Sequence, residues 1–209
     1  MVTRRQDVLR DTLRNKMVLF SCEGKAEGVI IGRLVEEQCM IVNSSQIIWD
    51  DSFDPSQPYT ELRKCQDIET AFLNQDWEAD VVILFVQDSL RHKPELSTVY
   101  REHASCVNIT TAPEIEILVI HGENRLSSYN KWKQRKRGSK GAQLKPSLFV
   151  KEVLGSEHAS FKDVKNTDFQ KSYWRDIDDL RSAIELYRQK ADSKKYSSHF
   201  MLADLLNPS

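Results

Sequence analysis

The chain has 209 residues, of which 40% are hydrophobic and 29% charged, and this is enough for one compact α/β domain with an appendage. It has no run of about eighteen apolar residues and no basic and apolar leader, which argues against a membrane-spanning helix and predicts a cytoplasmic protein. The four cysteines are far apart in the sequence and form no CxxC pair, so neither a zinc site nor a disulfide framework is indicated.

The net charge of −1 conceals one strongly basic stretch. Residues 124–151 contain no Asp or Glu but nine Lys and Arg side chains, so the rest of the chain carries ten more negative than positive charges. A basic patch on an otherwise acidic protein is typical of a surface that recognises phosphates or an acidic partner. Tyr129 and Trp132 lie among these charges and offer rings on which bases can stack. The alternative is a solubilising loop.

The first half of the chain alternates helix and strand. Residues 4–15 predict a short helix, and the apolar run at 17–22 predicts a buried strand of a parallel sheet. Apolar residues at helical spacing over 28–37 indicate a helix that packs on that sheet. Residues 46–49 predict a second short strand, and residues 61–73 predict a second helix.

The second half continues with strands and ends in helices. Residues 81–86 are the strongest predicted strand, and residues 107–110 predict the next one. Residues 114–122 predict a helix, although their alternation also suits a strand. The remaining predictions are a loop at 131–145, a helix at 146–154, an amphipathic helix at 169–189 and a terminal helix near 200–206.

This order of elements predicts an α/β, Rossmann-like fold with a mostly parallel sheet flanked by helices and a C-terminal helical extension. We divide the chain into a core at 1–122, a basic loop at 123–145 and a helical region at 146–209 that packs on the core.

Two acidic residues lie where predicted strands end. Glu23 follows the first strand and precedes Gly24, and Asp88 follows the strand at 81–86. Ligands and catalytic groups gather at the strand ends of α/β sheets, so both residues are candidates for a functional site.

The run Glu23-Gly24-Lys25-x-Glu27, set between a strand and a helix, resembles the opening motif of Toprim domains. This family occurs in topoisomerases, primases, a ribonuclease that matures ribosomal RNA, and nucleases of bacterial phage defence. The resemblance covers about residues 15–122. It implies that Glu23 is catalytic, that Gly24 permits the turn, and that Glu27 supports the site.

Toprim domains also carry two aspartates in a DxD pattern at the end of a later strand, where they hold a divalent cation. Asp88 matches the first of these positions, but Leu90 occupies the second. Glu114 and Glu116 are the residues that could supply the missing oxygen ligand, as in divergent Toprim-like proteins linked to bacterial restriction and defence loci. The resemblance therefore implies catalysis by Glu23, Glu27, Asp88 and Glu114, and Mg²⁺ or Mn²⁺ held by Glu23, Asp88, Glu114 and Glu116.

The resulting hypothesis is a metal-dependent nuclease, or nuclease-like effector, that cleaves DNA or RNA in phage defence. It implies nucleic acid as a partner, a companion ATPase because the chain has no P-loop, and a homo-oligomer as a further option. The residues that it assigns to nucleic-acid binding are Lys25, Lys131, Lys133, Arg135, Lys136, Arg137 and Lys140.

Two other functions remain open at this point. Leu90 favours a degenerate Toprim-like protein that has lost the DxD pair and binds nucleic acid or protein without cleaving it. The other is an unrelated nucleotide-processing enzyme in which Gly24 and the following helix N-terminus hold a phosphate.

Overall fold

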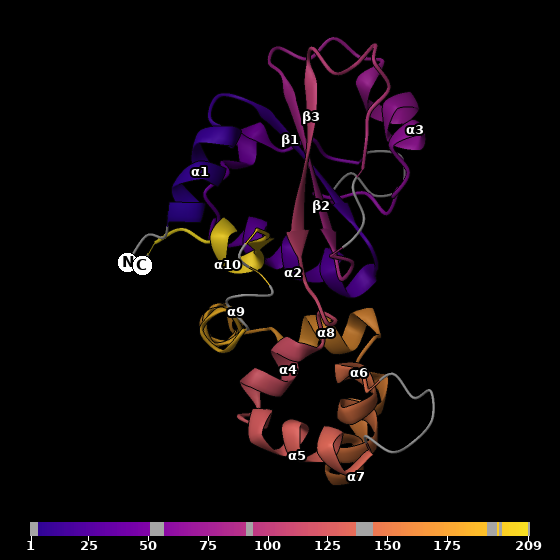
Figure 1. Cartoon of the computed structure of the whole chain (residues 1–209), viewed down its shortest axis with the longest axis vertical. Helices are drawn as coiled ribbons and strands as arrows, with labels where there is room; N and C mark the ends of the chain where they lie inside the picture. Colours follow the sequence, from indigo (N-terminus) through magenta and orange to yellow (C-terminus); the bar gives the residue numbers. More distant parts are fainter. Residues whose placement is uncertain are drawn as a thin grey trace.

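The computed structural model describes residues 4–50, 57–90, 94–136, 144–191, 196 and 198–208. An α/β half lies above a layer of helices, and the carboxyl ends of the strands face that layer (Figure 1). The protein is therefore an α/β protein in which the edge of the sheet where ligands gather is covered by helices.

A parallel sheet forms the centre of the α/β half. Every residue of its central strand β2 is buried, which is why this strand is an unbroken apolar run in the sequence. All neighbouring strand pairs are parallel, and the spatial order is β1-β2-β3-β4. The described strands are β1 (Met17–Cys22), β2 (Val81–Gln87), β3 (Ala104–Thr110) and β4 (Phe200–Met201). The predicted strands at 17–22, 81–86 and 107–110 are confirmed.

A further segment pairs with β1 on the side away from β2. Ile47 forms a parallel bridge with Val18, and Thr60 forms one with Ser21. After β1, the chain first pairs with one edge of this strand, at Ile47 and Thr60, and then forms β2 on the other edge. Such a switch in direction opens a crevice at the carboxyl ends of the strands on either side of it, here β1 and β2.

Alternate side chains of β1 enter two apolar clusters, one on each face of the sheet. Phe20 packs with α1 (Arg4–Leu13) and α2 (Lys25–Glu36). Leu19 packs with Ile68, the last residue of α3 (Cys65–Ile68), which continues as a π-helical turn over Glu69–Leu73. Both faces of the sheet are covered, as a parallel sheet requires.

The layer below the sheet consists of short helices and two longer ones, α5 and α9. α4 packs against α9, and α8 packs against α2 (Figure 1). The α-helices of the layer are α4 (Ile117–Gly122), α5 (Leu126–Lys136), α6 (Pro146–Phe149), α7 (Gly155–Glu157), α8 (Thr167–Tyr173) and α9 (Ile177–Lys190). A π-helical turn at Val150–Leu154 and a 3₁₀ turn at Ala159–Asp163 connect them.

Three predicted elements differ from the structure in the first part of the chain. The strand predicted at 46–49 is reduced to the bridge at Ile47, because Gln46 donates its side-chain amide to Leu13 O and Lys16 O and closes a 3₁₀ turn at Ser44–Gln46. The helix predicted at 28–37 begins earlier, at Lys25, directly after the Gly24 turn. The helix predicted at 61–73 begins later, at Cys65.

The predictions for the second part also need correction. Residues 131–136 are helical rather than a loop, because Tyr129 and Trp132 pack against Phe149 and anchor α5. Residues 137–143 lie outside the described residues. The predicted helix at 114–122 begins only at Ile117, and Glu114 precedes it with its side chain accepting a hydrogen bond from Ser147 N of α6.

The helix predicted at 169–189 is two helices, α8 and α9. Asp176 accepts a hydrogen bond from Asp178 N at 2.8 Å and so starts α9 as a separate helix. At the chain end, Phe200–Met201 pair with β3, and the helix there is only Leu202–Leu205 (α10). The predicted division at 122 and 145 stays a prediction, with the added fact that this last segment returns to the sheet.

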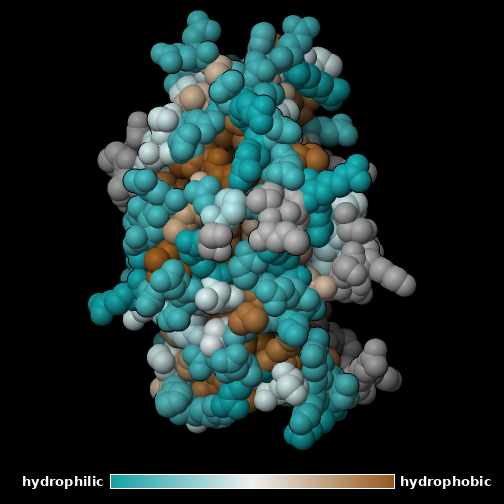
Figure 2. Space-filling view, turned by 90° about the vertical axis from the view of Figure 1, so that its left-hand side faces the viewer, coloured by the Kyte–Doolittle hydropathy of each residue, from teal (hydrophilic) through white to brown (hydrophobic). Residues whose placement is uncertain are grey.

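The face in Figure 2 is mostly hydrophilic, with separate apolar areas between polar side chains. In the described part of the chain, Val8, Trp49 and Val99 are the large hydrophobic residues that are exposed. Each helix described is too short or too polar to cross a bilayer.

Two glycines of α2 make a matched test of this packing. A Cβ at Gly32 would meet nothing within 4 Å, whereas a Cβ at Gly28 would lie 2.2 Å from the Tyr59 ring. We expect Gly32→Ala to raise the free energy of unfolding by about 0.5–1 kcal/mol through helix propensity, and Gly28→Ala to gain less because Tyr59 must move. Urea unfolding measures both. In a Tyr59→Ala background the two substitutions should become equal, and a persisting difference would contradict the contact.

Candidate functional site

A pocket of about 310 Å³ lies at the carboxyl ends of β1 and β2, next to the N-terminus of α2. All five acidic residues predicted from the sequence line it, and so does Lys25. The complete lining is Glu23, Gly24, Lys25, Ala26, Glu27, Arg63, Asp88, Glu114, Glu116, Lys145 and Lys165. Residues that are far apart in the sequence are therefore brought together at the crevice that the sheet topology creates.

Glu23 and Asp88 are held together by the pairing of their strands. Cys22 lies opposite Val86, and Glu23 N donates to Val86 O at 2.9 Å. Glu23 Oε2 accepts a hydrogen bond from Asp88 N at 2.8 Å. Glu23 Oε1 lies 3.7 Å from a guanidinium nitrogen of Arg63. Burial raises the pKa of Asp88, and the charge and hydrogen bond of Glu23 raise it further.

Glu27 lies in the first turn of α2 and is buried, with 8% of its surface exposed. Burial raises its pKa to about 8, and the nearby carboxylates Glu116, Glu23 and Asp88 act in the same direction. Glu27 is consequently mostly protonated at neutral pH. Its carboxyl group can donate a hydrogen bond until a cation enters or the pH rises.

Glu114 has a different environment from the other acids. Its Oε1 lies 3.2 Å from both Lys145 Nζ and Lys165 Nζ, and its Oε2 accepts a hydrogen bond from Ser147 N at 3.0 Å. Although burial opposes it, these bonds from Ser147 and the two lysines lower the pKa of Glu114. Because both oxygens already have partners, the geometry gives Glu114 the task of holding two lysines in the pocket.

Glu116 is also buried, and it lies 3.8 Å from Lys165 Nζ. Burial raises its pKa despite this lysine, and the charge of Glu114 adds to the effect. The carboxylates Glu116 and Glu114 in turn raise the pKa of Lys165 although burial opposes the change. Lys165 therefore carries its positive charge next to Glu114 and Glu116.

The sequence did not point to Arg63 or Lys165. Arg63 precedes α3, and Lys165 lies in the connection before α8, where no motif marks either one. Lys145 belongs to the basic stretch. Pro146 is a typical first residue of a helix, and this signal could have placed Lys145 at the start of α6. Tyr129 Oη donates to Leu144 O at 2.9 Å, so the packing of α5 positions the residue next to Lys145.

The predicted basic residues of α5 do not line this pocket. Lys131 and Arg135 are exposed, whereas Lys133 Nζ lies 4.2 Å from the centre of the Tyr129 ring and Lys136 pairs with Glu152. Arg137 and Lys140 lie outside the described residues. Tyr129 is 3% exposed, so its ring cannot stack on a base, and that expectation was wrong.

Leu90, which the Toprim resemblance aligns with the second aspartate of DxD, packs against the main apolar cluster. Within the described ranges, no three His, Cys, Asp or Glu side chains are already arranged to hold a metal ion.

Comparison of the chain with protein-family models, with curated proteins and with solved structures gives no match.

The buried Glu27 makes stability depend on pH. The pKa of Glu27 in the folded protein, about 8, lies above its ordinary value of 4.5. The neutral carboxyl group is therefore accommodated without penalty below pH 4.5, and this part of the free energy of unfolding is lost as the pH rises through 8. We expect Glu27→Gln to be more stable than the wild type by about 1–3 kcal/mol at pH 8, with the difference nearly gone at pH 4.5. Urea unfolding across this pH range measures it. A difference that does not change with pH would contradict the burial of an ionisable group here.

Proposed function

We propose that this protein is a Toprim-like, divalent-cation-dependent phosphodiesterase that cleaves nucleic acid. The observation that carries the proposal is the pocket itself, where five carboxyl groups and four cationic side chains meet at the ends of β1 and β2. The strand, Glu23-Gly24 turn and helix of the family motif lie in the expected order at this pocket. The role in bacterial phage defence and the companion ATPase rest on the sequence resemblance alone.

The donor set suits Mg²⁺ or Mn²⁺, because hard cations prefer carboxylate oxygens. Glu23 and Asp88 are the residues that would hold such an ion, with Glu27 and Glu116 beside them. Burial raises the pKa of Asp88 and of Glu27, and repulsion from the neighbouring carboxylates raises both further. A bound cation would relieve that repulsion. When bound, a divalent cation polarises a phosphodiester and lowers the pKa of a water molecule.

The cationic residues of the pocket have the complementary task of binding the phosphate. Lys145 and Lys165 are held 3.2 Å from Glu114, so they reach the pocket without occupying the oxygens of Glu23. Gly24 offers no side-chain cap to α2, and the helix N-terminus therefore presents N–H groups and a positive dipole to the same space. A phosphate between these groups would adjoin Glu23 and Asp88.

A second candidate function is nucleic-acid binding without cleavage. Leu90 favours it, because this partly buried residue packs against the core where an active Toprim domain has its second aspartate. The two functions differ in whether the carboxyl groups are needed for bond cleavage or only tune the charge of the pocket.

A cleavage assay separates them. The purified protein is incubated with Mg²⁺ or Mn²⁺ and plasmid DNA, single-stranded DNA, transfer RNA or ribosomal RNA. We expect cleavage of at least one substrate, reduced by about 100-fold or more in Glu23→Gln and in Asp88→Asn. Glu102→Gln, which replaces an exposed acid outside the pocket, is the matched control and should keep full activity. Salt-dependent binding with no metal-dependent cleavage would instead support the binding function.

The exposed cations of α5 predict the salt dependence of binding. Replacing Lys131 and Arg135 together with Ala should weaken nucleic-acid binding and reduce the slope of log K against log salt by about 1–2, because phosphate contacts release counterions. Fluorescence anisotropy at several salt concentrations measures the slope. The double substitution Arg10→Ala/Arg14→Ala, at the end of α1 and in the turn after it, removes the same charge elsewhere and should leave the slope unchanged. Equal slopes in all three proteins would exclude α5 from the interface.

A further inference from the structure

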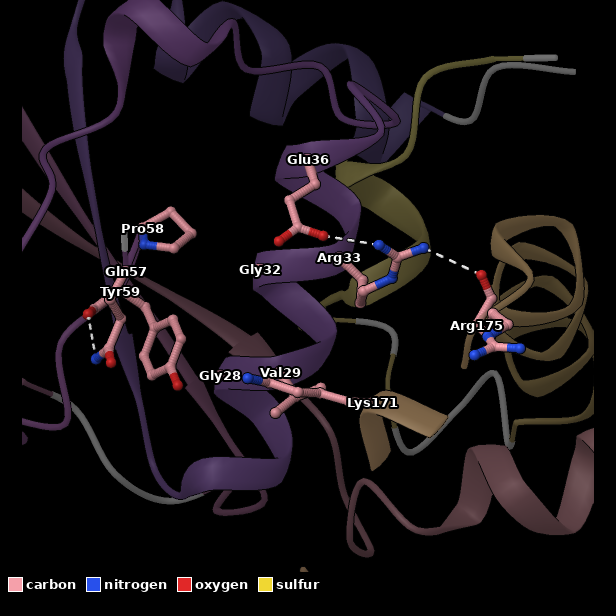
Figure 3. Close-up of a pocket in the computed structure, with 10 residues that line it drawn as sticks. All are labelled: Gly28, Val29, Gly32, Arg33, Glu36, Gln57, Pro58, Tyr59, Lys171 and Arg175. Atoms are coloured by element: carbon pink, nitrogen blue, oxygen red, sulfur yellow. Dashed lines mark hydrogen bonds and ion pairs between the residues drawn. The ribbon is translucent and has the colours of Figure 1, made fainter. Parts of the chain in front are cut away.

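A second pocket, of about 390 Å³, lies along α2 beyond the acidic one. Its floor is the face of α2 that carries Gly28 and Gly32 (Figure 3). Tyr59 lies on one side of the helix, and Lys171 and Arg175 lie on the other. We call this pocket the α2 groove.

The two glycines give the groove its shape. The Tyr59 ring occupies the space that a side chain at Gly28 would need, since its nearest atoms lie 2.2 Å from an ideal Cβ there. At Gly32 the corresponding space is open, with nothing within 4 Å. The groove is thus bounded by an aromatic ring at one turn of the helix and remains open at the next.

The charges of the groove favour an anionic ligand. The Arg33 guanidinium is bound to Glu36 at 2.7 Å, to Glu37 at 3.1 Å and to Arg175 O at 3.1 Å. Lys171 and Arg175 are exposed, and no carboxylate pairs with their side chains in the part of the chain that is described. Two unpaired cations across the groove from a tyrosine ring suit a group that combines a phosphate with a flat aromatic base.

The groove continues from the acidic pocket along the same structural elements. The first residues of α2, 25–27, line the acidic pocket, and farther along the helix Gly28, Val29, Gly32, Arg33 and Glu36 line the groove. Arg63 and Tyr59 come from one stretch of chain, and Lys165 and Lys171 come from another. One helix and two flanking segments therefore border both spaces, as expected for a path that a linear polymer follows.

We infer that the α2 groove is a nucleotide subsite, which holds a nucleotide next to the phosphodiester bound in the acidic pocket. Its base stacks on Tyr59, and its phosphate pairs with Lys171 and Arg175. This inference rests on the proposed function, because the phosphodiester next to the subsite is the one that the acidic pocket would cleave. The nucleotide chemistry itself could come from a single-stranded nucleic acid or from a free mononucleotide, and we assign it to the single strand because helix α2 and the same two flanking segments border both pockets.

Gly32 provides the sharpest test. Gly32→Leu fills the groove from its floor without a clash at Cβ, and Gly32→Ala is the matched control that adds only one methyl group. Both substitutions favour the helix, so neither should unfold the protein. Binding is measured by anisotropy with fluorescein-labelled 12-nucleotide DNA and RNA strands and with fluorescent AMP, in a Glu23→Gln background that prevents cleavage.

We expect Gly32→Leu to raise the Kd of a 12-nucleotide strand by about tenfold or more, because one stacked base and its phosphate contacts are lost. Gly32→Ala should stay close to the parent protein. Tyr59→Ala should weaken binding more than Tyr59→Phe, since only the former removes the ring. Equal binding by Gly32→Leu and Gly32→Ala, or no binding of any probe by the parent protein, would overturn the inference. Loss of AMP binding alone in Gly32→Leu would replace the single strand by a free nucleotide.

Hydrolysis of bis(p-nitrophenyl) phosphate with Mn²⁺, in the Glu23 protein, separates this inference from the proposed function. This small substrate needs the acidic pocket but is too short to reach along the groove, so Gly32→Leu should slow it far less than it slows cleavage of a 12-nucleotide strand. Hydrolysis of both substrates with no effect of Gly32→Leu would overturn the subsite alone. Absence of all hydrolysis would overturn the proposed function, and the binding experiment would still decide the subsite.

Discussion

The parallel pairing of β1 with β2 is the constraint on which the site depends. With Cys22 opposite Val86, both strands end at the same edge of the sheet, and Glu23 and Asp88 leave it side by side. Their carboxylates repel one another when both are charged, although Asp88 N donates a hydrogen bond to Glu23 Oε2. They are held together because a shift in register would move the apolar side chains of both strands out of the core. The burial of the strands thus supplies the free energy that keeps two like charges in contact.

The helical layer offsets the charge that the sheet gathers. Lys145 and Lys165 enter the pocket from the segments before α6 and α8, and Glu114 holds both. Glu27 avoids the remaining repulsion by retaining a proton, with a pKa of about 8. The pocket therefore combines acids that suit a cation with cations that suit a phosphate, which is the charge pattern that the proposed metal-dependent cleavage would use.

The helix α2 links the two halves of the proposed binding path. Its N-terminal turn faces the acidic pocket, and the face with Gly28 and Gly32 continues into the groove. Arg33 reaches from this helix to the backbone of Arg175, which fixes the groove's basic wall relative to its floor. A rigid helix that borders both spaces keeps the distance between them constant, and this suits a polymer with a regular repeat.

Much of the fold and half of the site followed from the amino-acid sequence by itself. The apolar runs of β1 and β2 and the acids after them determined an α/β sheet with Glu23 and Asp88 at its edge, because these signals are local. Only the tertiary structure decided that α5 is a helix, that Phe200–Met201 join the sheet, and that Arg63 and Lys165 reach the acids. Those features depend on contacts between residues far apart in the chain. Arg63 and Lys165 lie near carboxylates that are distant in the sequence, so no local pattern predicts their place in the site.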